Sequence, residues 1–173
     1  MIFKDNLLPP EPLNNFDYTV LKKIAEYQFF SRAVSDCLFP SPENFLVQRS
    51  STTGKIRNVL TKVGKLYLVL RAQDLLFSLN WESASVIKSC TKRPELRVII
   101  PSEVRGFVME GKNVFAKFVL DVDFRLRSGD EVLVVTEEDE LVAIGRMRLS
   151  GEEVKQYKRG VAVNVRRGAK DFD

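Results

Sequence analysis

The pattern of apolar and polar positions divides the start of the chain into an irregular arm and two helices. Residues 1–16 carry three prolines and no periodic apolar pattern. Over 17–31 the apolar residues recur three and four positions apart, which predicts an amphipathic helix with Asp17 as its N-cap. A second short helix is expected over 34–38, because Pro40 then breaks the pattern.

Three strands and a further helix are expected before the middle of the chain. The strands are 45–50, 55–60 and 65–72, separated by turn signals at Thr53-Gly54 and Val63-Gly64. Asn80 is positioned to cap a helix over 81–90. Helices on a short antiparallel sheet make a small α+β unit.

Short strands separated by turns continue through the second half. Ser102 opens a short helix that ends at Gly111, and Ser150 with Glu153 matches a capping box that begins a helix over 151–159. The expected strands are 96–100, 113–120, 131–135, 141–150 and 161–167. Strands of this length and spacing, with two short helices, predict a small closed or nearly closed β-barrel.

These elements predict an α+β chain with two domains. The segment 91–94 is polar and ends in proline, so the boundary is placed there. The expected parts are an irregular arm at 1–16, a small domain of helices on a short antiparallel sheet at 17–93, and a barrel-like domain at 94–173.

Charge is distributed unevenly along the chain, whose net charge is +4. Residues 1–94 hold 13 basic and 8 acidic side chains, whereas 95–173 hold 14 and 15. An acidic run at 137–140 is followed by a basic stretch over 146–170. Such a stretch is typical of a phosphate-binding surface, and a solvated, ion-paired surface is the alternative.

Composition excludes several kinds of site. The chain has no histidine, which excludes Ser-His-Asp and Cys-His catalysis and His-ligated zinc. Its two cysteines, Cys37 and Cys90, have no metal-ligand spacing, so no metal and no cofactor are expected. An acidic set at Asp121, Asp123 and Asp130 lies in and around a turn and does not suggest catalysis, so the chain is not expected to be an enzyme.

Hydropathy predicts a protein that does not enter a membrane. The longest apolar runs, LYLVL and VLVV, are far shorter than the ~20 residues that span a bilayer. The sequence MIFKDNLLPP at the start lacks the pattern of a secretory signal. A cytoplasmic location is therefore expected.

The motifs of the second half occur in the order of a known RNA-binding module. NVFAKFV follows Gly111, and RSGDEVLVV, LVAIGRMRLSGEEV and KRGVAVNVRRG come after it. This series resembles the PUA domain, named after pseudouridine synthases and archaeosine transglycosylases, over about 95–170. The resemblance implies a pseudo-β-barrel that binds RNA.

The first half resembles the domain that precedes PUA in archaeal tRNA-guanine transglycosylase. The matching segments are EYQFF at 26–30, RSSTTGKIRNV at 49–59 and LYLVLRAQDLLFSL at 66–79. Phe30 and Leu75 depart from the family pattern, in which glycine is usual at both positions. The catalytic (β/α) barrel of that family needs ~250 residues, for which a chain of 173 has no room.

The resemblance also maps candidate RNA-binding residues. RNA would lie in a groove between the first helix, its glycine loop and neighbouring strands, which corresponds to Arg105, Gly106, Gly111, Lys112, Asn113 and Lys117, with Arg146, Arg148, Arg166 and Arg167 nearby. Glycine lets backbone N–H groups approach phosphate, and arginine contacts phosphate in a bidentate way. For Gly111 the alternative role is only a helix C-cap. For Arg146 and Arg148 it is simple solvation.

Further candidates lie on the strands. Phe115 or Phe118 could stack a base, but Phe118 lies in register with Val114 and Ala116 and is expected in the core. In the first half the basic residues that flank the Thr53-Gly54 turn are Arg49, Lys55, Arg57 and Arg71. If the strands that carry Arg49 and Arg57 pair with each other, the side chains of these two arginines could extend the RNA-facing surface.

Two functional hypotheses follow, because a third, a free-standing enzyme, would need a pocket with perturbed carboxylates or lysine, and the sequence offers no such constellation. The first is a non-catalytic protein that binds tRNA or another structured RNA. The alternative is an RNA-docking subunit of a separately encoded RNA-modifying enzyme, such as a tRNA-guanine transglycosylase. The two share RNA as a partner, and they differ in whether a second protein surface is needed.

Overall fold

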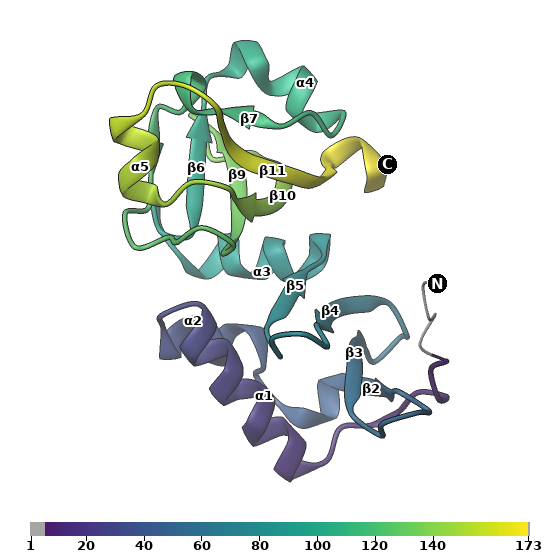
Figure 1. The fold of residues 1–173 in the computed structure, drawn as a ribbon. Helices are drawn as coiled ribbons and strands as arrows, with labels where there is room; N and C mark the ends of the chain where they lie inside the picture. Colours follow the sequence, from purple (N-terminus) through teal and green to yellow (C-terminus); the bar gives the residue numbers. More distant parts are fainter. Residues whose placement is uncertain (1–5, 173) are drawn as a thin grey trace. The chain divides into compact units, whose positions relative to one another are not determined.

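The computed structural model describes residues 6–172, which form two compact units that divide between Ile87 and Lys88 (Figure 1). Helix α3 (Trp81–Cys90) crosses the division, and its bounds are those predicted from the sequence. Within 6–172, no helix is both long enough and apolar enough to cross a bilayer. The predicted α+β class is confirmed, because each unit combines helices with a mainly antiparallel sheet.

In the first unit, two helices accompany one antiparallel sheet, whose strand order is β1-β2-β3-β4-β5. Its elements are β1 (Glu11–Pro12), α1 (Asn15–Gln28), α2 (Arg32–Leu38), a 3₁₀ turn (Pro42–Asn44), β2 (Phe45–Arg49), β3 (Ile56–Thr61), β4 (Leu66–Leu70) and β5 (Phe77–Leu79). The two helices and the strands β2 to β4 were predicted. The short strands β1 and β5 were not, because two or three residues give no readable alternation.

Helix α1 begins earlier than expected. Its N-cap is Asn14, whose side-chain oxygen accepts a hydrogen bond from the Asp17 N–H at 2.8 Å. The Asn14 amide in turn donates to the Asp17 carboxylate at 2.8 Å, so Asp17 lies in the first turn and is not the cap. The helix ends at Gln28, because Phe30 adopts a left-handed conformation with φ of 59°.

An aromatic cluster forms the core of the first unit. The Phe39 ring meets Phe45 edge-on at 5.3 Å between centroids, and it also contacts Tyr67 and Phe77. The Tyr67 hydroxyl, although buried, donates to the Leu38 carbonyl at 2.8 Å. The cluster therefore joins the end of α2 to three strands of the sheet.

The second unit is a six-stranded sheet curled into a half-barrel, with strand order β7-β11-β10-β9-β6-β8 (Figure 1). Its elements are β6 (Arg97–Ile100), a 3₁₀ turn η2 (Ser102–Val104), α4 (Arg105–Met109), β7 (Val114–Phe115), a 3₁₀ turn η3 (Ala116–Phe118), β8 (Asp121–Val122), β9 (Glu131–Thr136), β10 (Leu141–Met147), α5 (Gly151–Gln156), β11 (Val161–Gly168) and a 3₁₀ turn η4 (Ala169–Phe172). Strands β6 and β9 are parallel, and the other pairs are antiparallel. No pairing within the described residues joins β7 to β8, so the sheet is not a closed barrel.

Two sequence predictions in this unit have opposite outcomes. The capping box is confirmed: the Ser150 side chain accepts from the Glu153 N–H, and the Glu153 carboxylate accepts from the Ser150 N–H. The strand predicted over 113–120 is wrong, because β7 has only two residues before the chain turns into η3. The strand alternation is lost there, and Phe118 is 37% exposed instead of lying in the core.

Candidate RNA interface

Helix α4 and the turn after it build an apolar pocket on the second unit. Gly111 has φ of +95°, a conformation that favours glycine, and the Lys112 N–H donates to the Phe107 carbonyl at 3.1 Å. This turn leads the chain from α4 into β7. The pocket has a volume of about 330 Å³, and its lining includes the rings of Phe107, Phe115 and Phe118.

The three rings of the pocket are unusually exposed for phenylalanine. Phe107 is 64% exposed and Phe115 is 46% exposed, while Phe118 adds a partly covered ring. A flat apolar ring that is open to solvent is suited to stacking on a nucleobase. Phe107 is not among the residues predicted from the sequence, although its neighbour Val108 already supplies the buried position of α4.

Cations surround this pocket. Lys112 lines it, and the Lys117 ammonium lies 4.9 Å from the centre of the Phe118 ring. The Ala116 N–H donates to the Gly160 carbonyl at 2.9 Å, which holds the turn containing Lys158 and Arg159 beside η3. These last two residues were not among the predicted contacts. Within residues 6–172, neither forms an ion pair, and both are exposed.

Of three other residues of the predicted groove, two have roles in the fold and the third has none that the backbone requires. The Asn113 side-chain oxygen accepts from the Val165 N–H at 2.9 Å, which links the start of β7 to β11. Arg105 makes a bidentate contact with Glu140, at 2.7 and 2.5 Å. Gly106 has ordinary helical geometry with open space around it, so nothing in the backbone requires glycine there.

The arginines at the strand ends fall into two groups. Arg146 and Arg166 both contact the carboxylate of Glu131, at 3.3 and 2.5 Å. The Glu131 side chain has no exposed surface, so it holds both guanidinium groups against the sheet while each stays about one-third exposed. Arg148 is exposed beyond the end of β10, and the Arg167 guanidinium lies over the Phe172 ring at 4.2 Å.

In the first unit, two of the predicted arginines form ion pairs with carboxylates of the same unit. Arg49 forms ion pairs with Glu11 and Asp17, which join β2 to β1 and α1. Arg71 is 8% exposed and pairs with Asp74 at 2.8 Å.

The remaining two have different surroundings. Strands β2 and β3 do pair, with a register shift that places Ile56 opposite Arg49, and Arg57 lies next to this irregularity and donates to the Ile56 carbonyl. Lys55 is exposed, and no ion pair involves it within the described residues. An RNA-facing surface on this unit stays a prediction.

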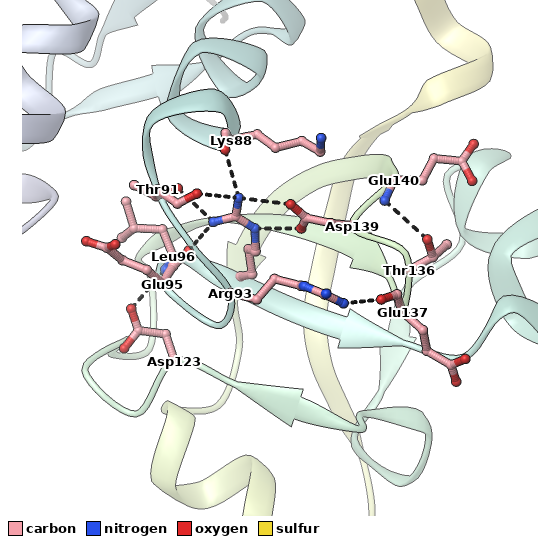
Figure 2. A network of polar contacts seen from close by, with 11 residues as sticks. Lys88, Thr91, Arg93, Glu95, Leu96, Asp123, Thr136, Glu137, Asp139 and Glu140 are labelled. Carbon is pink, nitrogen blue, oxygen red and sulfur yellow. Dashed lines mark hydrogen bonds and ion pairs between the residues drawn. The ribbon is translucent and has the colours of Figure 1, made fainter.

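The acidic run at 137–140 is partly engaged by neighbouring groups, some of which Figure 2 shows. Arg93 donates to the Glu137 carbonyl, and Ser102 donates to the Glu138 carboxylate at 3.4 Å. Arg97 has no exposed surface and pairs with Asp139 at 2.8 Å. Asp139 therefore anchors this turn to the fold, while the neighbouring Glu137 and Glu138 lie on the surface.

Contacts with arginine lower the pKa of two carboxyl groups in the second unit. The hydrogen bond from Arg105 holds the pKa of Glu140 below its usual value. Burial acts to raise the pKa of Asp123, but hydrogen bonds from Arg125 and from the Leu96 N–H outweigh burial and lower that pKa. Both groups therefore stay ionised and structural near neutral pH.

Each of the two units matches a known domain family. Residues 96–169 match the PUA domain, and residues 19–94 match the patch-forming domain C2 of tRNA-guanine transglycosylase. The chain thus contains a PUA domain, an RNA-binding fold, preceded by the patch-forming domain of the transglycosylase type.

Curated relatives carry this region as part of a longer chain. The chain is 38% identical over 156 residues to the tRNA-guanine(15) transglycosylase of Methanocaldococcus jannaschii, which covers 90% of this chain and 23% of the relative. It is 41% identical over 145 residues to the corresponding enzyme of Thermococcus kodakarensis, covering 84% and 24%. The chain therefore spans about a quarter of these relatives, at their C-terminal end, and does not match their catalytic part.

Solved structures agree on the fold. A hypothetical protein from Pyrococcus horikoshii superposes with a TM-score of 0.73 over 94% of this chain and 96% of its own, at 22% identity. A PUA domain from Aeropyrum pernix superposes with a TM-score of 0.63 over 95% and 87%, at 13% identity.

Proposed function

We propose that this protein is a non-catalytic RNA-binding protein that holds an unpaired nucleotide of a tRNA, or of another structured RNA, in the pocket beside α4. The observation that carries the proposal is the exposure of Phe107, Phe115 and Phe118 around one hollow, with Lys112 at its edge. A base stacks between such rings, and the cation contacts its phosphate. A tRNA-binding role implies the cytoplasm.

The charge around the pocket fits this ligand. Lys112, Lys117, Lys158 and Arg159 are exposed on the pocket rim and on the turn beside η3. Each phosphate contact adds about −0.7 to −0.9 to the slope of log K against log salt concentration. Four such contacts predict a slope of roughly −3.

The non-catalytic part of the proposal rests on what the chain offers chemically. Within residues 6–172, no group of three or more cysteine, aspartate and glutamate side chains is arranged to hold a metal ion. The perturbed carboxyl groups Asp123 and Glu140 are held in ion pairs that stabilise the fold.

The test is binding of the purified chain to total tRNA, and to tRNA trimmed at its unpaired 3′ end, at two salt concentrations. Phe107→Ala should weaken binding to intact tRNA about 10-fold or more, since stacking contributes about 1–3 kcal/mol per base. Phe124→Ala is the matched control, because Phe124 is 54% exposed and lies outside the pocket. Equal binding by the two variants, or salt-independent binding, would overturn the proposal.

A second candidate function is an accessory role in tRNA modification. Relatives that are 38–41% identical carry this region as the C-terminal quarter of tRNA-guanine(15) transglycosylases. This chain would then dock tRNA for a catalytic chain encoded separately. Adding the purified chain to such an enzyme should lower its KM for tRNA, and an unchanged KM would argue against this role.

A further inference from the structure

Helix α1 has a second apolar face that the fold of its unit leaves exposed. Its buried side consists of Leu21, Ala25 and Gln28. Its other side consists of Phe16, Val20, Ile24 and Tyr27, which recur four, four and three residues apart. Phe16 is 78% exposed, Val20 41% and Tyr27 67%. Exposed apolar residues that follow helical spacing form a continuous stripe, unlike the scattered ones found on any surface.

Leu75 extends this stripe from a neighbouring turn. It is 44% exposed and lines a shared hollow with Val20, Ile24 and Tyr27. We call Phe16, Val20, Ile24, Tyr27 and Leu75 the α1 face.

The conformation of Leu75 is unfavourable for leucine. Its φ is 58°, in the left-handed region where glycine has no steric cost and other residues do. The turn is fixed around it, because the Leu75 N–H donates to the Arg71 carbonyl at 3.0 Å and Asp74 pairs with the Arg71 side chain. A leucine held in this conformation with its side chain exposed gains little from its own fold, which points to a role in contact with a partner.

The charges beside the α1 face favour a protein partner over RNA. Two hollows adjoin this face: the charged residues are Lys23 and Asp74 in one, and Asp17, Arg49 and Lys55 in the other, where Arg49 pairs with Asp17. Lys23 lies 3.3 Å from Glu26, and Asp74 lies 2.8 Å from Arg71. Phosphate binding needs available cations, whereas apolar protein interfaces exclude charge from their centres.

The relatives indicate what this partner is. In the Methanocaldococcus jannaschii transglycosylase, the counterpart of this chain is the C-terminal 23%, so most of that protein precedes it. The patch-forming domain match begins at residue 19, within α1. Similarity to a further transglycosylase relative covers 96% of this chain, so it begins at or before residue 8. The Leu8 N–H donates to the Arg49 carbonyl at 2.9 Å, and Arg49 lines a hollow together with Val20 and Leu75. The rest of a relative therefore joins the chain on the side of the α1 face.

We propose that the α1 face is the docking surface for the catalytic part of a tRNA-guanine transglycosylase, supplied as a separate chain. This inference rests on the accessory role proposed above. The side chains of the α1 face are apolar, with charged residues only around them, and this face lies on the first unit, whereas the RNA pocket lies on the second. The two binding activities are thus separable by mutation.

The experiment co-expresses the full chain with the transglycosylase catalytic chain of the same genome and measures their affinity by calorimetry without RNA. A stable complex is expected. The double variant Val20→Ser/Tyr27→Ser should weaken it at least 10-fold, whereas the pocket variant Phe107→Ala should leave it unchanged. The double variant should bind tRNA normally, because it does not alter the pocket.

Leu75→Gly provides a second test, because it should change stability and affinity in different directions. It removes an unfavourable conformation, so the melting temperature should stay equal or rise, while affinity for the catalytic chain falls. The docking proposal is overturned if no complex forms, if no such catalytic chain is encoded, if the α1-face variants bind as tightly as the parent, or if the face mediates only self-association. If the parent chain does not bind tRNA, that result counts against the RNA-binding function only. The docking measurement is made without RNA and can still be interpreted.

Discussion

The buried guanidinium of Arg97 pairs with the partly exposed carboxylate of Asp139, with Nε of the arginine 2.8 Å from Oδ1 of the aspartate. The same guanidinium donates to the carbonyls of Lys88, Thr91 and Glu95. Asp139 belongs to the turn between β9 and β10, so one side chain ties the segment after α3 to that hairpin (Figure 2). A planar group with five donors can satisfy several carbonyls and a carboxylate at once.

Replacing Arg97 should strongly destabilise the second unit. Arg97→Ala removes the donors to the carbonyls of Lys88, Thr91 and Glu95 and the cation that pairs with Asp139, so the free energy of unfolding should fall by about 3 kcal/mol. Arg97→Lys should lose most of the same stability, because an ammonium cannot replace the fork of donors. Urea unfolding followed by circular dichroism measures both. Lys170→Ala is the control: its pair with Glu110 is half-exposed on both sides and should contribute less than about 1 kcal/mol. Equal effects of Arg97→Lys and Lys170→Ala would contradict this account.

Local signals in the sequence predicted most of the fold. The capping box at Ser150 and the helix over 81–90 follow from contacts within a few residues, and the structure confirms both. The α1 cap was misassigned because Asn14 and Asp17 are both good N-cap residues, and the structure shows Asn14 as the cap with Asp17 in the first turn, where it also pairs with Arg49.

Long-range contacts could not be predicted in the same way. Nothing local marks Arg97 as buried, since its partners lie up to 42 residues away. Phe118 was expected in the core because strand alternation was extended through a segment that instead turns into η3. At the pocket, the glycine turn and Lys112 were expected, but Phe107 was missed because a phenylalanine on a short helix is usually a core residue.

Asn113 offers a test that separates a structural role from RNA contact. Asn113→Ala leaves the Val165 N–H without its side-chain acceptor and, because this hydrogen bond is exposed to water, should lower the free energy of unfolding by about 0.5–1 kcal/mol. Asn113→Asp keeps an acceptor oxygen and should retain most of that stability. If this side chain lies at the RNA surface, however, the added negative charge should weaken tRNA binding severalfold. Thermal unfolding and a filter-binding assay measure the two effects. Full RNA binding by Asn113→Asp would assign the residue to the fold alone.

Asp123 should make the second unit sensitive to acid. Burial opposes its ionisation, but Arg125 and backbone N–H groups hold its pKa below the unfolded value of about 3.9. A lowered folded-state pKa contributes stability that is present above the unfolded value and lost as pH falls through the folded one. Asp123→Asn should therefore cost about 2 kcal/mol at pH 7 and flatten the decline in stability below about pH 4. Unfolding curves between pH 2.5 and 7 measure this. A parallel decline in parent and variant would assign the acid sensitivity to other carboxyl groups.

Lys158 and Arg159 should contribute to RNA affinity through charge alone. The hydrogen bond from Ala116 to the Gly160 carbonyl holds their turn beside η3, and within the described residues no carboxylate neutralises them. Replacing both with alanine should weaken tRNA binding and reduce the steepness of the salt dependence by about 1.4–1.8, since two phosphate contacts are lost.

The contrast with Phe107→Ala makes this prediction specific. Loss of stacking should lower affinity at every salt concentration and leave the slope unchanged, because no counterion release is involved. Lys62→Ala, an exposed change on the first unit, serves as the control for charge. If the double variant lowered affinity without changing the slope, the two cations would act through the shape of the turn. If its slope and affinity both matched those of Lys62→Ala, the phosphate path would not pass over this turn.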